Sequence, residues 1–343
     1  MGLIPIDGEL GEGQVLRSAL TLAAVTGQGF EMNRIRARRP RPGLRPRHVA
    51  AIRAVSLCCR AEVHGAFDGS PDLRFKPGPV TSGTYDFDIG TAGAAPLVLQ
   101  AMLPVAATAE GPSRIWISGG THLTGTPSSH FVARHWTPMV ERLGLHPHLV
   151  LERAGFAPRA EGRLRADVSG WTRSASLDLT RRGSLVQVRG LSGEAHLKGD
   201  VARRQAEAAR ALLWEQRRLE SDWDVVELPA VSPGSCLQIE AVFENGRAAF
   251  AYLAERGVPA EMLGERASRR LLRFLDEEEA CIDPWLADQL AVPAALARGG
   301  ARLVTSEVTP QLETVASVLG LFGVTATTFG RRGGPGGLEI EKC

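Results

Sequence analysis

The chain repeats one pattern of apolar and polar positions three times. Each copy begins with an apolar helical stretch that ends at glycine and leads into a short strand-like segment. The helical stretches read GQVLRSALTLAAVTG, AAPLVLQAMLPVAATAEG and WLADQLAVPAALARGG, and they start near Gly13, near Ala94 and at Trp285. Because glycine ends helices and β-branched runs favour strands, the pattern predicts a helix followed by a strand in each copy.

A second helix follows each of these strands after a loop. Each begins close to a proline, at Pro46, Pro127 and Pro310. Proline suits the first helical position because its missing N–H would have no partner there. Strand-like segments follow each second helix. The sequence therefore predicts an α/β (α+β two-layer) fold built from three repeated βαβα-type units.

The spacing of the units predicts an insertion. The first two units start roughly 80 residues apart and the next two roughly 190 apart. The extra segment, 183–278, has its own succession of strands and helices, which predicts a small α/β domain placed before the third unit. The remaining residues, 1–182 and 279–343, are expected to form one large discontinuous domain.

Composition restricts the class of protein. No apolar stretch is long enough to cross a bilayer, and the first residues, MGLIPIDGEL, lack the features of a signal peptide. The five cysteines form no CxxC pair. We therefore expect a cytoplasmic protein with reduced thiols, which are more simply explained as buried structural groups than as catalytic ones.

Basic residues are concentrated in one segment. Residues 33–48 carry seven arginines and no acidic residue, although the whole chain has a net charge of only +2. A solvated face usually mixes charges of both signs, whereas the planar guanidinium suits bidentate contact with phosphate. The prolines and glycine of the segment predict a turn on which these side chains converge. A polyanion site is the favoured interpretation, with a solvated face as the alternative.

The first unit opens with DGELGEGQVLRS, in which glycines lead directly into a helix. Glycine lets backbone N–H groups approach an anion, and the start of a helix favours negative charge. Gln14 and Arg17 lie in the first turns, and the Glu12 carboxylate could hold a divalent metal beside phosphates. Taken alone this signal is weak, because glycine turns before helices are common.

The other two units offer polar side chains in apolar helices. Gln100 needs partners if it is buried, but it is unremarkable if it lies on the surface. Trp285 offers a plane for stacking, and Asp288 and Gln289 offer groups that suit a base edge. From the pattern alone, a capped amphipathic helix is the slightly better explanation of the segment WLADQ.

The histidines do not show the spacing of a metal site. His146 and His148 lie two apart in a strand-like segment, and His130 and His135 lie five apart in a helix. Neither pair shares a face cleanly, so surface or packing roles are expected.

Several long segments together resemble the RNA 3′-terminal phosphate cyclase family over nearly the whole chain. They include DGELGEGQVLRSAL, IRARRPRPGLRPRH, FDIGTAGAAPLVLQAMLP, ISGGTHLTGTPSSHF, LAERGVPAEMLG and WLADQLAVPAAL. The resemblance implies a large domain of three repeated α/β units with a small α/β domain inserted before the third, which agrees with the pattern described above.

The resemblance also implies a reaction. Members of the family use ATP and a divalent metal, Mg or Mn, and an active-site histidine attacks the α-phosphorus to give a histidine–AMP intermediate. AMP then passes to an RNA 3′-phosphate, and the neighbouring 2′-hydroxyl closes a 2′,3′-cyclic phosphate. The expected partners are therefore ATP and RNA with a 3′-phosphate end, with no membrane.

The family's functional residues carry over by position. Glu12 matches the metal-binding carboxylate. The nucleotide-binding positions are Gln14, Arg17, Arg39, Gln100, Pro127, Trp285, Leu286, Ala287, Asp288 and Gln289. In this resemblance Pro127 and Trp285 form the pair that sandwiches adenine. The expected RNA phosphate contacts are Arg36, Arg38, Arg41, Arg45 and Arg47, and such a track should make binding depend on salt.

The third unit departs from the family at the residue that matters most. Gln311 falls on the nucleophilic histidine and Val315 falls on an asparagine. Glutamine cannot replace the histidine, because its amide nitrogen lone pair is delocalised into the carbonyl. The glycine-rich opening is also two residues short, PRAEGR (158–163) replaces a glycine-rich stretch, and His122 stands where an aspartate is usual.

The local pattern around Gln311 still predicts the start of a helix. Thr309 is expected as the N-cap, Pro310 in the first turn, and Glu313 near the positive helix end. The buried face is expected to hold Val315, Val318, Leu319 and Phe322.

Three hypotheses follow. The first is a cyclase in which glutamine has been substituted for the nucleophile, so that ATP binds but AMP does not attach. The second is a natural non-catalytic relative that binds RNA or assists assembly. The third is an enzyme of related architecture that acts on small phosphate-bearing substrates. The retained pocket residues favour the first, and the weakened glycine segments favour the second.

Overall fold

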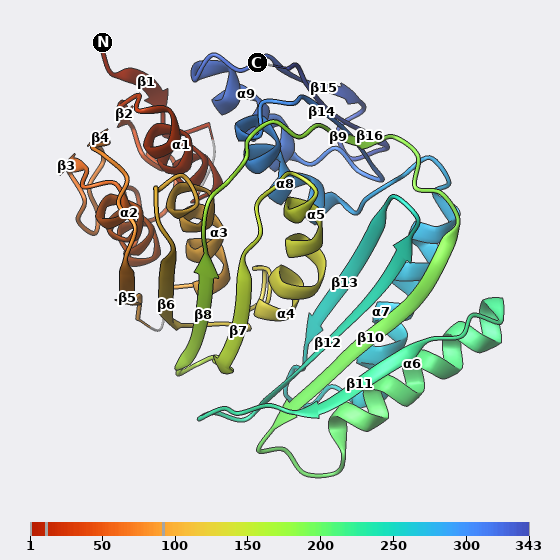
Figure 1. The fold of residues 1–343 in the computed structure, drawn as a ribbon. Coiled ribbons are helices and arrows are strands. Elements are labelled where there is room, and N and C mark those ends of the chain that lie inside the picture. The colour runs from red at the N-terminus through yellow and green to blue at the C-terminus, as the bar shows by residue number, and fades with distance from the viewer. Residues whose placement is uncertain (1, 11–12, 91–92, 343) are drawn as a thin grey trace.

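The pattern that recurs in the sequence folds into three units of one topology (Figure 1). The structure is a computed structural model that describes residues 2–10, 13–90 and 93–342. The first unit consists of β1 (Ile4–Asp7), α1 (Gly13–Thr26), β2 (Phe30–Asn33), α2 (Pro46–Cys58), β3 (Glu62–His64) and β4 (Leu73–Lys76).

The second and third units have the same order of elements. The second contains β5 (Thr84–Asp88), α3 (Ala95–Ala106), β6 (Ser113–Gly119), α4 (Ser129–Phe131), a π-helical turn η1 (Val132–Trp136), α5 (Thr137–Glu141), β7 (His148–Arg153) and β8 (Gly162–Val168). The third contains β9 (Leu177–Leu179), α8 (Pro284–Leu296), β14 (Ala301–Thr305), α9 (Pro310–Leu321), β15 (Ala326–Gly330) and β16 (Gly336–Ile340).

Strand pairing shows that the repeat is structural. The sheets run β1-β2-β4-β3, β5-β6-β8-β7 and β9-β14-β16-β15. In each, the first two strands are parallel, and the last strand pairs antiparallel with the second. The predicted α/β fold class is confirmed. The last strand of the first two units, β4 and β8, was not predicted.

The helices of the three units pack against one another and share one core. Helix α1 contacts α3, α8 and α9, and the buried residues of all three units form a single cluster. Helices α3 and α8 are buried on nearly all sides. An apolar stretch without a polar face is what a helix packed among other helices requires. This arrangement brings the beginnings of α1, α8 and α9 together.

A fourth sheet follows β9. It is built from β10 (Leu185–Ala195), α6 (Val201–Arg217), β11 (Asp222–Glu227), β12 (Gly234–Phe243), β13 (Arg247–Leu253) and α7 (Ala260–Asp276). The sheet order is β11-β10-β12-β13, and it has a hydrophobic cluster of its own against α7. Strand β13 was not predicted. The domain boundaries 183–278 stay a prediction.

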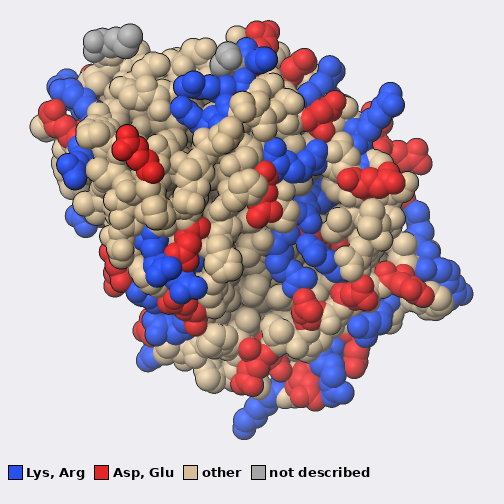
Figure 2. Space-filling model, viewed as in Figure 1, with Lys and Arg blue, Asp and Glu red and all other residues tan. Residues whose placement is uncertain are grey.

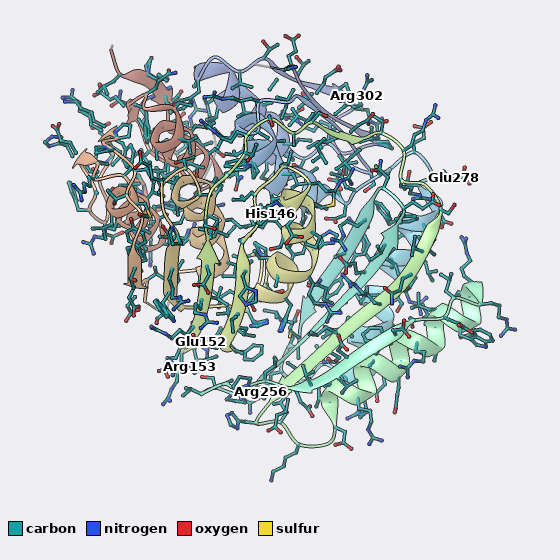
Figure 3. The ribbon with its side chains drawn as sticks, viewed as in Figure 1. His146, Glu152, Arg153, Arg256, Glu278 and Arg302 are labelled. Carbon is teal, nitrogen blue, oxygen red and sulfur yellow. The ribbon has the colours of Figure 1, made fainter. Side chains whose placement is uncertain are left out.

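This fourth sheet interrupts the third unit when that unit is counted from its first strand, because β9 precedes it and α8 follows it. Figure 3 labels Glu278, where the chain leaves α7 and returns to the third unit, and Arg302, which lies on β14 of that unit.

The second helix of the second unit differs from the prediction. It begins at Ser129 rather than at Pro127, because the Ser128 hydroxyl caps it by accepting a hydrogen bond from the Phe131 N–H at 3.0 Å. It also passes through the π-helical turn and ends at Glu141.

The cysteines and the length of the helices are as the sequence predicted. Cys58, Cys59, Cys236 and Cys281 are buried and free, as expected for structural thiols, whereas Cys343 lies outside the described residues. Within the described part of the chain, no helix has the length and apolar character to cross a membrane.

We expect Gly264→Ala to destabilise the protein although alanine favours helices. Gly264 lies in α7 against α6, and an added Cβ would overlap the Gln205 carbonyl oxygen and lie 2.8 Å from the Ala209 nitrogen. This overpacking should lower the free energy of unfolding by roughly 1–3 kcal/mol in urea titrations.

Gly320→Ala is the matched control, because Gly320 lies in α9 and nothing lies within 4 Å of its added Cβ. There the gain in helix propensity should stabilise by about 0.5–1 kcal/mol. Equal effects of the two substitutions would contradict the close approach of α6 to α7.

Candidate nucleotide-binding site

One cavity of about 820 Å³ lies where α1, α8 and α9 begin. The predicted site residues that line it are Gln14, Arg17, Arg39, Arg47, Pro127, Trp285, Asp288, Gln289 and Gln311. They come from all three units, so the packing of the helices, and not the sequence order, brings them together. The volume suits a ligand the size of a nucleotide.

The α9 end of the cavity has the predicted helix start. The Thr309 hydroxyl accepts a hydrogen bond from the Leu312 N–H at 2.9 Å, and Pro310 occupies the first turn. The predicted apolar face of α9 is buried. Gln311 is exposed and faces the cavity. The N–H groups of the first turn and the helix dipole therefore favour an anion here.

Helix α8 supplies another wall. Its N-cap is Asp283, which accepts a hydrogen bond from the Leu286 N–H at 3.0 Å. Trp285 is 46% exposed and contacts Phe131 in a T-shaped arrangement, so much of its indole remains available for stacking. Pro127 lines the same cavity, as the predicted adenine sandwich requires. Leu286 and Ala287 are wholly buried and do not line the cavity, so the structure does not place their side chains at the site.

Asp288 links α8 to α9. Its carboxylate accepts a hydrogen bond from the Thr309 hydroxyl at 2.6 Å. The pKa of Asp288 is raised to about 7, chiefly by burial. The hydrogen bond from Thr309 lowers this pKa, whereas the negative charges of Asp283 and Glu307 raise it. Near neutral pH the group is therefore partly protonated, and it can donate as well as accept a hydrogen bond.

The α1 end of the cavity is positively charged. The Arg17 guanidinium donates to the Gln14 amide oxygen at 2.7 Å. Burial and the charge of Arg47 lower the pKa of Arg17 to about 10, and it is still a cation at neutral pH. Gly13 leaves room for this position of the guanidinium, because an added Cβ would lie 2.8 Å from it and would displace it. The pKa of His48 is lowered to about 3, chiefly by burial and also by the positive charges of Arg47 and Arg17.

Gln100 lies at the base of the site. It is 9% exposed and borders a small hollow that is also lined by Gln14, Arg17 and Gln289. Neither atom of its amide has a hydrogen-bond partner among the described residues. Buried amides in native proteins are normally paired, so these atoms are available to a ligand or to water.

The arginines of residues 33–48 divide into different roles. Arg47 and Arg39 line the cavity. Arg36 donates to the Arg41 carbonyl at 2.9 Å and thereby holds its own loop. Arg38 pairs with Glu9 at 3.1 Å, and Arg45 pairs with Asp68 at 3.4 Å. The predicted RNA track therefore consists partly of arginines that already contact acids of the same chain.

Among the described residues that line the cavity, there is no histidine, cysteine or lysine, and Asp288 is the single carboxylate. His48 lies close by but is buried, and its Nδ1 accepts a hydrogen bond from the Arg45 N–H at 3.1 Å. Glu12, the predicted metal ligand, lies outside the described residues. Asp288 alone, with its raised pKa, does not make a site for a hard divalent cation, which prefers several charged oxygens.

A buried ionic cluster holds the N-cap of α8, Asp283, in place. His135 Nδ1 lies 2.6 Å from Glu240 Oε1, and its Nε2 lies 2.6 Å from Asp283 Oδ2. Both nitrogens must donate, so the ring is an imidazolium. Burial alone would lower the pKa of His135, but Asp283 and Glu240 raise it. This cluster was not predicted, because its members lie far apart in the sequence.

Arginines complete the cluster. Arg189 Nε lies 2.6 Å from Glu240, and Arg247 lies 3.3 Å from it. Burial raises the pKa of Glu240, but the bonds from His135 and the charges of Arg247 and Arg189 lower it to about 2. Figure 2 shows basic side chains concentrated on this face over the region where α5 meets β13.

Comparisons with known proteins point to one family. The sequence model of the RNA 3′-terminal phosphate cyclase family matches residues 8–328. A protein from Ralstonia nicotianae named RNA 3′-terminal phosphate cyclase is 40% identical over 93% of this chain and 91% of its own length. One of the same name from Methylococcus capsulatus is 39% identical over 94% of this chain and 92% of its own.

Among solved structures, the enolpyruvyl transferase NikO from Streptomyces tendae has 15% sequence identity and a TM-score of 0.26, and it covers 49% of this chain and 33% of its own. A likeness of that size supports no conclusion about fold or function.

We expect His135→Ala to lower the free energy of unfolding by roughly 3–5 kcal/mol, because it leaves two buried carboxylates without their shared cation. The raised pKa of His135 fixes the pH dependence. The stabilisation of the folded state by protonated His135 is complete below about pH 6.5, and it is lost as the pH rises through the pKa of His135 in the folded protein. Urea titrations at several pH values measure both effects.

His146→Ala is the control, since His146 is exposed near the end of α5 (Figure 3). It should change stability by less than about 0.5 kcal/mol at every pH. A gap between native chain and His135→Ala that widened with rising pH would contradict the imidazolium assignment.

Proposed function

The chain belongs to the RNA 3′-terminal phosphate cyclase family, and on that premise we propose that its cavity binds ATP and the 3′-phosphate end of RNA without forming a covalent enzyme–AMP intermediate. One observation carries the second part of the proposal. Gln311 occupies the exposed first turn of α9 in the cavity, and no histidine, cysteine or lysine stands among the described residues that line it.

The charged end of the cavity supports polyphosphate binding. Arg17, Arg39 and Arg47 line it, and α1 and α9 both begin there. Guanidinium groups and helix N-termini are the two devices by which proteins most often hold phosphate groups. The phosphates are therefore assigned to the space between the start of α1 and the start of α9.

The other end supports binding of the base. Trp285 and Pro127 both line the cavity, and the proposal assigns them to the two faces of the adenine ring. Asp288 and Gln289 lie on the same helix as Trp285, and together they offer donors and acceptors for the edge of adenine. The unpaired amide of Gln100 completes the polar contacts from below.

A divalent metal, Mg or Mn, would neutralise phosphate charge, and the proposal assigns Glu12 to hold it. The other predicted track residues, Arg36, Arg38, Arg41 and Arg45, lie on the loop that leads to Arg47. Because Arg38 pairs with Glu9 and Arg45 pairs with Asp68, Arg41 is the better candidate for contact with the RNA backbone.

Glutamine at position 311 removes the covalent step. An imidazole nitrogen has a free lone pair with which to attack phosphorus, whereas the lone pair of an amide nitrogen is delocalised. The surrounding groups, Thr309, Pro310 and Thr314, still form a helix start that would hold a phosphate. A non-catalytic role in RNA binding is the second candidate, and the same missing nucleophile favours it.

We expect Arg17→Ala to weaken ATP binding roughly 10- to 100-fold, the loss that follows from removing a hydrogen bond to a charged group. Isothermal titration calorimetry with ATP and Mg²⁺ measures it. Arg53→Ala is the matched control, because Arg53 is exposed on α2 and does not line the cavity. If both variants bound ATP like the native chain, the polyphosphate assignment would be wrong.

We expect the chain as it stands to remain unlabelled when incubated with α-labelled ATP, metal and a 3′-phosphate RNA, and Gln311→His to form labelled protein and cyclic RNA ends. Gln311→Asn, which keeps an amide, should behave like the native chain. Covalent labelling of the native chain would refute the assignment of Gln311. Failure of Gln311→His to label or cyclise, while it still binds ATP, would leave the non-catalytic RNA-binding role.

A further inference from the structure

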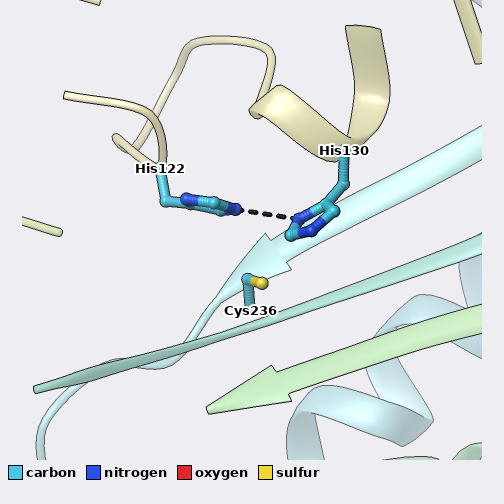
Figure 4. A group of neighbouring side chains, drawn as sticks. All are labelled: His122, His130 and Cys236. Atoms are coloured by element: carbon cyan, nitrogen blue, oxygen red, sulfur yellow. Dashed lines mark hydrogen bonds between the residues drawn. The ribbon is translucent and has the colours of Figure 1, made fainter. Parts of the chain in front are cut away.

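Three potential metal ligands that do not line the nucleotide cavity meet at one point (Figure 4). His122 lies in the loop after β6, His130 lies in α4, and Cys236 lies near the start of β12. The first two belong to the second unit and the third belongs to the fourth sheet. One ligand atom from each lies within 4.8 Å of the others.

We propose that His122, His130 and Cys236 bind a thiophilic divalent transition-metal ion, zinc being the best fit, which clamps the fourth sheet to the second unit. Two imidazoles and one thiolate are a donor set typical of zinc, whereas Mg²⁺ and Mn²⁺ prefer oxygen. The inference does not depend on the proposed nucleotide function.

The distances are close to those that a bound ion requires. His122 Nε2 and His130 Nδ1 already lie 2.9 Å apart. With Zn–N bonds of about 2.0–2.1 Å and a Zn–S bond of about 2.3 Å, tetrahedral ligand atoms are separated by about 3.3 to 3.6 Å. The nitrogens therefore need to part by a few tenths of an ångström, and the sulfur needs to approach by about 1 Å.

The surroundings resemble the support that metal-binding histidines normally have. His122 Nδ1, the nitrogen that faces away, lies 2.8 Å from the Thr121 hydroxyl. That hydroxyl in turn accepts a hydrogen bond from the Gly155 N–H at 2.8 Å. Such a chain fixes the ring orientation of a ligating histidine. Ser129 Oγ, at 3.5 Å from His122 Nε2, is the nearest further oxygen.

Buried side chains enclose the cluster. His122 and Cys236 are buried, and Phe156 stacks on the His122 ring with centroids 5.0 Å apart. Phe156 also covers Gly234, where an added Cβ would overlap its ring. Burial lowers the pKa of His122 and of His130, the latter to about 4, and it raises the pKa of the Cys236 thiol to about 12, so a bound ion has to displace the thiol proton.

Binding has a defined proton balance. The ion takes the place of the proton on Cys236 Sγ, which leaves to solvent, and it replaces the hydrogen bond between the two imidazoles. No electron transfer or further reactant is involved. With three protein ligands, the fourth position is left for water or for a neighbouring oxygen.

Cobalt(II) provides the test, because a cobalt–thiolate bond has a charge-transfer absorption that oxygen and nitrogen ligands do not produce. The full chain is dialysed against a chelator and titrated with CoCl₂. We expect the absorption to saturate at one equivalent, to disappear when ZnCl₂ is added, and to persist in excess MgCl₂. Cys236→Ser should abolish it, and His130→Ala, which leaves the buried thiol in place, should weaken it.

Cys281→Ser is the matched control, since Cys281 is also buried and free but lies outside the cluster. It should keep the full absorption. The proposal is overturned if the native chain gives no thiolate absorption with one equivalent of cobalt, or if Cys236→Ser keeps it. Because no cysteine stands among the described residues that line the nucleotide cavity, metal bound there does not produce the same signal.

Discussion

The placement of α8 depends on one buried imidazolium. His135 holds Glu240 of β12 with one nitrogen and Asp283 with the other, both at 2.6 Å. Asp283 also caps α8 and accepts a hydrogen bond from the Ala249 N–H of β13 at 3.2 Å. A carboxylate without its cation would be strongly unfavourable here, so the second unit, the fourth sheet and α8 are held in one arrangement.

That arrangement positions the nucleotide cavity. Helix α8 carries Trp285, Asp288 and Gln289 in the turns just after its N-cap, Asp283. Because His135 holds Asp283, it also helps to determine where these side chains face. From the other side, Thr309 joins Asp288 to the start of α9. The fourth sheet therefore helps to position α8, because its Glu240 binds His135 and its Ala249 N–H donates a hydrogen bond to Asp283.

Local patterns predicted much of this fold. The apolar helices and the N-cap at Thr309 depend on neighbouring residues, and the structure confirms them. The predicted glycine end is correct for α1, which ends beside Gly27, but α3 ends at Ala106 and α8 at Leu296, before their glycines. Strand β8 was missed although its residues alternate strictly between buried and half-buried, because its outward arginines gave it a polar composition. Arg163 on that strand pairs with Asp86 at 2.7 Å, so these charges belong to the outer face of the sheet.

The sequence by itself determined the three-fold repeat, the family resemblance, the positive segment and the glutamine at position 311. These are properties of residue type and local order. Only the tertiary structure decided that side chains from three units share one cavity, that Leu286 and Ala287 face the core, and that His135 and His130 point to different clusters. The physical reason is that burial, ion pairing and ligand geometry depend on distances in space, which spacing along the chain does not fix when partners lie a hundred or more residues apart.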